Sequence, residues 1–490
     1  MNPIRLNPLD AAWIVTESRA TPNHVGGLLQ FKLPDNAPND FMRKMMSEFR
    51  GHKQFAPPWN QRLKESYHLN PVRTWVEDDN IDLEYHVRHA ALPWPGGERE
   101  LGELVGRLQS TPLDLSRPPW ECTIIEGLEG NRFALFIKMH HSLIDGVSGV
   151  KLLQAAMSPD PKKSMGLPPF WASGKPAKAS TRKRSETLIP TVTQALAGAV
   201  QELRMQATTV PQLVSAFSKL VQQAVAPGSG MALPFAAPRS VLNGRVREKR
   251  RFATQQFEMA RLRALATAAE CTLNDVVLTM CGTALRRFLE ERDSLPDKPL
   301  TAGIPVSVRP KDDEGNGNAI TFIVSTLGTD IADTRDRLDA IRESVKQAKA
   351  HVQSLPRQAM MQYTMLLMAP TLLTLLTGIG GRTRPMFNIT ISNVPGPETP
   401  QYFRGAEMLA SYPASIVTHG QALNITCQSY AGFMNFGFTG CHSSMPSMQR
   451  LAVYTSEALA ELEATFVPAA KQTAPRKRAP AKKTKVPKVG

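Results

Sequence analysis

Two adjacent histidines, an acid and a glycine stand within seven residues in the segment HHSLIDG. His140 and His141 follow a run of apolar residues, and Asp145 and Gly146 come shortly after them. Imidazole titrates near neutrality, so a positioned histidine can take a proton from a hydroxyl and give it back. This pattern favours general-base chemistry, such as acyl transfer from a thioester to an alcohol. Asp145 is too close in the turn to act as a relay, and we expect it to pair with an arginine elsewhere.

Other interpretations of the same residues are open. A histidine pair is often structural, and Ser142 and Ser148 are expected to be turn residues and not nucleophiles. A metal site is not predicted, because no glutamate stands between helically spaced histidines and no cysteine is near. The five cysteines of the chain are scattered without a CxxC pair, which is typical of reduced thiols in a cytoplasmic protein. The first ten residues show no secretory signal.

The elements that must position the histidines are a strand before them and a helix after them. Residues 132–139 (RFALFIKM) are predicted to form a strand with period-two alternation, and residues 149–157 have helical spacing. The same criteria predict further strands at residues 25–33, 120–126, 251–258, 300–308, 387–394 and 423–429. They predict further helices at residues 101–113, 259–270, 274–291 and 333–351. The chain is therefore expected to belong to the α/β (α+β) class.

Composition divides the chain into four parts. Residues 1–157 and 240–466 are expected to form two α/β domains, and residues 158–239 a Pro/Lys-rich and helical linker whose start is an exposed connector. Residues 467–490 are predicted to be a disordered basic tail. Eight Lys or Arg and no acid lie in the last twenty residues, which accounts for about half of the net charge of +15. Such a tail suits an anionic lipid surface, and it would bind nucleic acid without specificity.

An uncharged stretch covers residues 358–381 and approaches the length of a membrane span. Pro370 stands at its centre, and Gln362 and four threonines interrupt it. We therefore expect a buried or interfacial helix pair with a break at Pro370, which could line an acyl-chain pocket, and not a transmembrane helix.

HHSLIDG resembles the HHxxxDG signature of the CoA-dependent acyltransferase superfamily. Further segments are similar to the bacterial wax ester synthase/diacylglycerol acyltransferase family, and together they span nearly all of the chain except the linker and the tail. These segments are residues 6–31, 116–141, 272–289, 304–310 and 388–408. The chain departs from the family pattern in having Pro118-Pro119-Trp120 in place of Pro-Leu-Trp, and in a shortened GNGNAIT segment.

The resemblance implies two chloramphenicol-acetyltransferase-like domains, each a mixed sheet with helices, and an active-site tunnel between them. It implies acyl-CoA as cosubstrate, no cofactor, no metal, and a fatty alcohol or a diacylglycerol as acceptor. His141 corresponds to the family's general base, His140 is expected to support or orient it, and Asp145 is expected to be structural.

The sequence suggests roles for several further residues, and for some of them it leaves two alternatives open. Asn274, of the pair Asn274–Asp275, is a candidate for shaping the oxyanion site, but TLND before a helix is also typical of an N-cap. Arg309 ends a predicted strand and is a candidate partner for Asp145; otherwise it is a surface arginine. His24 and His419 are expected to be structural or to line the tunnel. Trp13 and Trp120 are expected to be core aromatics.

The sequence thus predicts a long-chain-alcohol or diacylglycerol O-acyltransferase that works at a peripheral membrane or lipid-droplet surface, without a specific nucleic-acid partner. Two alternatives stay open. One is an acyltransferase of the same superfamily with another acceptor, and the other is a catalytically silent lipid-surface binding protein. The intact motif argues against the silent protein.

Overall fold

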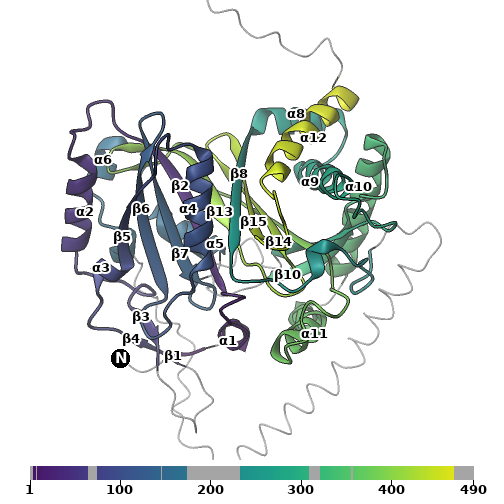
Figure 1. Cartoon of the computed structure of the whole chain (residues 1–490), viewed down its shortest axis with the longest axis horizontal. Helices are drawn as coiled ribbons and strands as arrows, with labels where there is room; N and C mark the ends of the chain where they lie inside the picture. The colour runs from purple at the N-terminus through teal and green to yellow at the C-terminus, as the bar shows by residue number, and fades with distance from the viewer. Residues whose placement is uncertain are drawn as a thin grey trace, which may run out of the picture.

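Two lobes lie side by side in the computed structural model, each built on a six-stranded mixed sheet (Figure 1). The structure describes residues 4–6, 8–64, 74–144, 146–173, 232–307, 320–354 and 357–467 of the chain. The predicted tail, most of the predicted linker, Asp145 and Arg309 lie outside these residues. The predicted α/β class with mixed sheets is confirmed.

The first sheet has the order β12-β13-β2-β7-β6-β5. Its strands are β2 (His24–Lys32), β5 (Val87–Ala91), β6 (Trp120–Leu128), β7 (Arg132–His140), β12 (Tyr402–Phe403) and β13 (Ala406–Ala414). β5 and β6 are parallel, and the other neighbours are antiparallel. A small second sheet of β1 (Ile4–Arg5), β4 (Thr74–Glu77) and β3 (Gln61–Leu63) lies below it in Figure 1.

The second lobe carries the sheet β10-β9-β11-β14-β15-β8. Its strands are β8 (Arg250–Glu258), β9 (Thr301–Ser307), β10 (Ile320–Thr326), β11 (Ile389–Val394), β14 (Leu423–Tyr430) and β15 (Phe433–Cys441). β11 runs parallel to both of its neighbours. All the strands predicted from alternation are present, with shifts of one or two residues at their ends.

Helices cover both sheets. Those of the first lobe are α1 (Pro8–Val15), α2 (Phe41–Gly51), α3 (Leu83–His86), α4 (Glu98–Ser110), α5 (Gly146–Gln154), α6 (Pro161–Met165) and the 3-10 helix η1 (Phe170–Ala172). Those of the second are η2 (Val241–Asn243), α8 (Met259–Ala268), α9 (Leu273–Glu290), α10 (Thr334–Gln353), α11 (Arg357–Leu376) and α12 (Arg450–Phe466).

The start of the predicted linker is part of the first core and not an exposed connector. Phe170 and Trp171 are buried and pack against Trp120, and Trp59 joins the same aromatic cluster. The segment PPFW contains two large aromatic side chains whose burial stabilises the fold. The Pro/Lys-rich composition around this segment led instead to the prediction of an exposed connector. Trp120 is a core aromatic as predicted.

The two lobes are joined by strands that cross from the second lobe into the sheet of the first. β12 and β13 belong in sequence to the second lobe but extend the first sheet, and β13 pairs along β2. β13 also crosses the second sheet, where Ser411 donates a hydrogen bond to Gln428 Oε1 over 2.9 Å. On another side of the boundary, α4 packs along the edge strand β8, and the Arg250 amide donates to Ser110 Oγ over 2.8 Å. The predicted domain boundaries stay a prediction, but a strictly sequential division does not describe this crossing.

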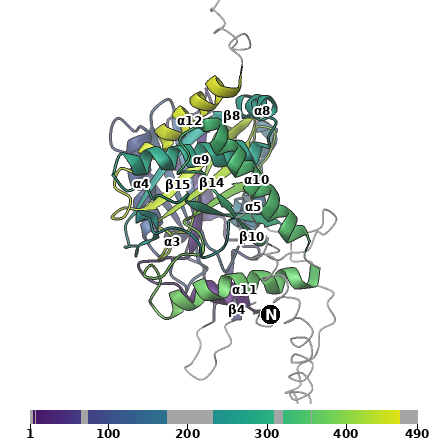
Figure 2. The same cartoon turned by 90° about the vertical axis from the view of Figure 1, so that its right-hand side faces the viewer.

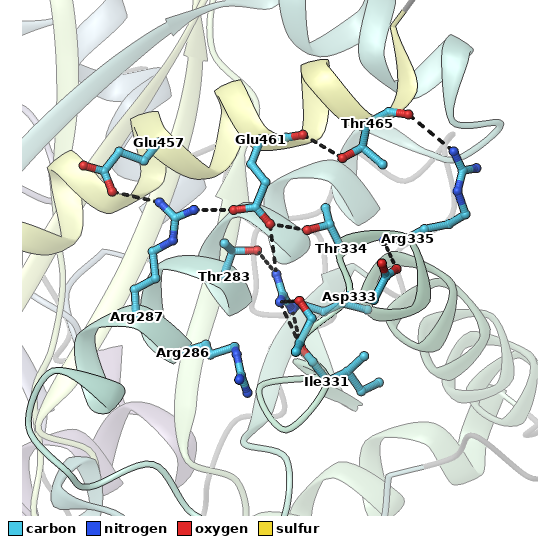
Figure 3. A network of polar contacts seen from close by, with 12 residues as sticks. Thr283, Arg286, Arg287, Ile331, Asp333, Thr334, Arg335, Glu457, Glu461 and Thr465 are labelled. Atoms are coloured by element: carbon cyan, nitrogen blue, oxygen red, sulfur yellow. Dashed lines mark hydrogen bonds and ion pairs between the residues drawn. The ribbon is translucent and has the colours of Figure 1, made fainter.

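A polar network ties the helices of the second lobe together (Figure 3). The Arg337 guanidinium, on α10, is buried and donates to Thr283 Oγ1 on α9 over 2.6 Å. Glu461 on α12 accepts from Arg287 on α9 and from Thr334 on α10. A hydrogen bond to a charged group contributes about 1.5–3 kcal/mol, and less where solvent screens it, as at the partly exposed Arg287 and Glu461. The network therefore stabilises the helix layer over the second sheet chiefly through the buried Arg337.

The uncharged stretch forms one helix, α11, and not the expected helix pair, because Pro370 lies inside it without ending it. Pro370 and the residue before it are exposed, so the proline ring lies on the outer side of the helix. Among the described residues, no helix has the length and apolarity needed to cross a membrane.

Candidate active site

The predicted histidine pair lies where β7 ends and the chain turns toward α5. The carbonyl of His140 accepts hydrogen bonds from the amides of Leu143 and Ile144, over 3.0 and 3.3 Å. Gly149 of α5 packs close to this strand end, since a Cβ built there would lie 3.1 Å from Met139 Sδ. The strand, the turn and the helix start therefore fix the backbone of both histidines.

His140 is buried and held by two side chains. Its Nε2 lies 2.6 Å from Glu17 Oε2, and its Nδ1 lies 2.5 Å from Ser142 Oγ. The Ser142 amide also donates to Nδ1, over 3.2 Å. Because the carboxylate and Nδ1 both accept, this pattern places a proton on Nε2. Both ring nitrogens are thus engaged, which fits a positioning role and not that of a base.

His141 has a different environment. Its side chain is partly exposed, and its amide donates to the Asn23 carbonyl over 2.9 Å. Its ring stacks on Trp13 of α1, with centroids 4.6 Å apart and an interplanar angle of 26°. The prediction that Trp13 is a core aromatic was wrong: the indole is half-buried and holds the plane of the His141 ring.

Residues 16–23 form a short connection between α1 and β2 that serves both histidines. Glu17 contacts His140, and the Asn23 carbonyl receives the His141 amide. Ser18 and Thr21 close this connection with a backbone bridge and a side-chain hydrogen bond of 2.7 Å. The Asn23 side chain donates to the Trp13 carbonyl over 2.7 Å, so the end of this connection is tied back to α1.

Arg250, at the start of β8, anchors this connection to the second lobe. Its guanidinium is buried and donates to the Ala20 carbonyl over 2.6 Å and to the Val417 carbonyl over 3.4 Å. It also donates to the carbonyls of Arg247 and Glu248. Burial lowers the pKa of Arg250 to about 10, so it stays charged at neutral pH. One charged side chain therefore joins the two lobes beside the histidines.

Behind the histidines lies a buried ion pair. Lys138 Nζ, two residues before His140, lies 3.2 Å from Glu121 Oε2, and both side chains are almost fully buried. Lys138 also donates to the carbonyls of Leu108 and Thr111. Burial lowers the pKa of Lys138, and the facing Glu121 opposes that shift.

His24 faces His140 across the β2–β7 pair. Burial holds the pKa of His24 well below its usual range, and the charge of Lys138 adds to that effect. Its Nε2 lies 3.0 Å from the Gln109 carbonyl and must carry the ring proton. His24 is therefore a neutral, structural residue, one of the two roles expected for it.

The chain matches the sequence profile of the wax ester synthase/diacylglycerol acyltransferase catalytic domain over residues 6–277, and that of the family's C-terminal domain over residues 316–463. An Acinetobacter baylyi protein named O-acyltransferase WSD is 39% identical, over 92% of this chain and 95% of its own length. The chain belongs to this family.

A Mycobacterium tuberculosis relative, provisionally named a diacylglycerol O-acyltransferase, is 44% identical over 94% of this chain and 97% of its own length. The solved wax ester synthase/diacylglycerol acyltransferase of Marinobacter aquaeolei VT8 is 36% identical, with a TM-score of 0.75 over 94% of this chain and 99% of that one. A condensation domain of the calcium-dependent antibiotic synthetase, 15% identical with a TM-score of 0.56, covers 94% of this chain and 95% of its own, and shares the fold.

The other predicted site residues of this family member are spread over the molecule. Gly146 begins α5 and is exposed. Asp275 lies in a capping box: its carboxylate accepts from the Thr272 amide over 2.9 Å and from Thr272 Oγ1 over 2.7 Å. Thr272, and not Asn274 or Asp275, is the N-cap residue of α9. Asn274 follows in the first turn of α9, so the described contacts of the pair favour the structural alternative. Asp145 and Arg309 lie outside the described residues, and their pairing stays a prediction.

His419 borders a cavity of about 230 Å³ in the second lobe. Its Nδ1 accepts from the Val246 amide over 3.1 Å, and its Nε2 lies 3.4 Å from an Arg245 nitrogen. Pro370, Thr371 and Thr374 of α11 form another wall. The lining role expected for His419 thus applies to this cavity, while the tunnel between the lobes stays a prediction. Among the described residues, no group of three or more His, Cys, Asp or Glu could hold a metal ion.

Sequence reasoning missed Glu17, Asn23 and Arg250. Glu17 stands 123 positions before His140, and only the pairing of β2 with β7 brings the two regions together. A usable signal was present in one case: Asn23 immediately precedes the HVGG strand, so its carbonyl lies at the strand end that faces β7. Arg250 gave no signal, because it stands in the basic run REKRR.

Proposed function

We propose that this chain transfers a long-chain acyl group from acyl-CoA to the hydroxyl of a fatty alcohol or a diacylglycerol, with His141 as the general base. The observation that carries the proposal is the contrast within the histidine pair. His140 is buried and engaged at both nitrogens, whereas the His141 ring is partly exposed and stacks on Trp13, and the His141 backbone amide donates to the Asn23 carbonyl. Membership of the family supports the substrate classes.

The chemical step is direct transfer in a ternary complex. The His141 imidazole takes the hydroxyl proton as the acceptor oxygen attacks the thioester carbonyl. The resulting tetrahedral oxyanion collapses, the carbon–sulfur bond breaks, and the imidazolium returns its proton to the leaving thiolate of coenzyme A. A positioned general base contributes about 10²–10⁴-fold to such a step, and no serine or cysteine nucleophile is needed.

The residues around His141 then act by positioning. Trp13 limits rotation of the His141 ring, and Glu17 fixes His140, whose backbone leads directly into His141. Asp145, paired with Arg309, would hold the turn after the histidines, and hydrogen-bond donors near the thioester would stabilise the oxyanion. Asn274 was a candidate for shaping that site, and its place in the first turn of α9 weakens that candidacy.

The acceptors are water-insoluble, so we place the enzyme on the cytoplasmic face of a membrane or on a lipid inclusion. The basic tail would add about 1 kcal/mol of attraction per Lys or Arg near an anionic surface.

The test is to supply the purified full chain with palmitoyl-CoA and either hexadecanol or a diacylglycerol. We expect free thiol release with at least one acceptor, together with the matching wax ester or triacylglycerol. Thiol release that does not depend on an acceptor would indicate a thioesterase. If neither acceptor gives thiol release, a catalytically silent lipid-surface binding protein is the better interpretation.

A further inference from the structure

The outward face of α11 is apolar where a surface helix is normally polar. Leu373 and Leu376 of α11 and Ile379, three residues past its end, are 61%, 50% and 42% exposed, and they follow one another at three-residue spacing. Ala369 and Pro370 continue the exposed face by one turn toward the N-terminus. Large exposed apolar patches on proteins mark surfaces that bind a partner or a membrane. We call these five residues the α11 face.

The opposite side of α11 is already satisfied by the second lobe. Tyr363 and Leu367 are buried and pack in a cluster with Val324 of β10. The polar groups nearest the exposed face are also satisfied: Thr374 Oγ1 donates to the Thr371 carbonyl and Thr377 Oγ1 to the Leu373 carbonyl, each over 2.7 Å. The buried side of α11 therefore holds the helix against the second lobe. Covering the exposed side would leave few polar groups without a hydrogen-bond partner.

The charges that flank the α11 face along the sequence all have one sign. No Asp or Glu occurs between Glu343 and Glu398, while Arg382 and Arg384 follow the helix and are exposed. Arg245 is also exposed, and it donates to the Gly378 carbonyl just after the helix end, over 2.6 Å. An apolar strip bordered by arginines matches the acyl region and the phosphates of an anionic lipid surface. It would repel a second copy of itself.

We infer that the α11 face is the surface by which the enzyme docks on anionic lipid, with Arg245, Arg382 and Arg384 at the headgroups. This inference rests on the proposed function, because an enzyme with lipid substrates needs such a contact. The cavity of about 230 Å³ adjoins the docking surface, since Pro370, Thr371 and Thr374 line it from α11 and Arg384 lines it from the segment beyond. A chain leaving the lipid would meet this cavity first. In both views α11 lies at the lower end of the molecule (Figures 1 and 2).

The experiment is co-sedimentation of the full chain with phosphatidylcholine vesicles, with and without phosphatidylglycerol, at low and high salt. The double variant Leu373→Ser/Leu376→Ser should partition at least about tenfold more weakly into the anionic vesicles, because its apolar contact is lost. Arg382→Ala should weaken binding only at low salt, where headgroup attraction is not screened. The matched control is Val453→Ser, a 54% exposed valine on α12, which should bind as the parent chain does. Helix α12 is labelled in the upper part of Figure 1, whereas α11 is labelled in the lower part.

Thiol release from palmitoyl-CoA with a short, water-soluble alcohol is measured without vesicles in parallel. The leucine variant should retain this activity, which shows that it is folded. Unchanged vesicle binding of an active leucine variant overturns the docking surface, as does a leucine variant that changes only from dimer to monomer on gel filtration. A parent chain that binds vesicles through the α11 face but never releases thiol leaves the surface intact and refutes the proposed function.

Discussion

His140 and His141 have the same side chain, but the fold places them in different environments and so gives them different roles. His141→Ala removes the partly exposed imidazole, and we expect the rate of thiol release to fall by about 10²–10⁴-fold with little change in melting temperature. His89→Ala is the control, since this histidine lies on the edge strand β5, two strands away from β7 in the same sheet. A His141→Ala enzyme within tenfold of the parent rate would remove the general base from the mechanism.

We expect Glu17 to act through His140 and not on the substrate. Glu17→Gln keeps the shape of the side chain but loses the charge of the 2.6 Å contact, and Glu17→Ala loses the contact altogether. A charge-assisted hydrogen bond contributes about 1.5–3 kcal/mol, so we expect kcat to fall more than about tenfold for alanine and less for glutamine. The Michaelis constant for acyl-CoA should change little. A purely structural Glu17 would instead lower the melting temperature and leave kcat per folded molecule unchanged.

His351 supplies a pH-dependent contribution to stability. It is buried, its Nε2 has no hydrogen-bond partner among the described residues, and burial lowers its pKa. Below about pH 6.5 the unfolded chain gains a proton on this residue that the folded chain does not, so stability falls as the pH falls. His351→Leu should therefore reduce the difference in melting temperature between pH 7.5 and pH 5.5. An unchanged difference would show that the imidazole is solvated in the folded protein.

At the scale of elements, Arg250 links β8 to the 16–23 connection. Arg250→Lys keeps a positive charge, but an ammonium cannot reproduce the fixed directions of a guanidinium that serves several carbonyls. We expect a loss of about 3 kcal/mol in unfolding free energy and a lower kcat, because Glu17 and Asn23 lose their anchor. Arg251→Lys is the matched control, since Arg251 is the next residue along the chain and its guanidinium contacts His442 at an exposed position. Equal effects of the two substitutions would contradict the anchoring role.

The elements themselves were largely predictable, and their contacts were not. Period-two alternation and β-branched residues located β7 and β14, although both strands are buried on both faces, and helical spacing located α9 and α10. Trp13 carries no such mark: an indole in an amphipathic segment looks the same whether it faces a core or a histidine. β13 itself was not among the predicted strands, and its crossing into the first sheet could not have been predicted from its residues, because a strand's pattern reports burial and not its neighbour.

Over the whole molecule, that crossing makes the two lobes depend on each other. β13 pairs with β2, whose first residue faces His140, and it also lies against β15 of the other sheet. Arg250 and α4 join the lobes at a separate point. Relative movement of the lobes must therefore disturb the strand that carries the histidines, so stability and turnover should respond together to damage at the crossing.

Gly437 on β15 tests this coupling. A Cβ built there would lie 1.8 Å from the Pro413 carbonyl oxygen of β13, a distance that real Cβ atoms do not adopt, so the strands must separate. Gly437→Ala should cost about 3 kcal/mol or more of unfolding free energy, and the protein that remains folded should turn over more slowly than the parent. Gly51→Ala is the control, because a Cβ at that position meets nothing within 4 Å. The measurements are chemical denaturation and thiol release per folded molecule. A Gly437→Ala enzyme that is destabilised but fully active would mean that the catalytic strand does not depend on the contact between the lobes, since β13 would then yield without disturbing β2 and β7.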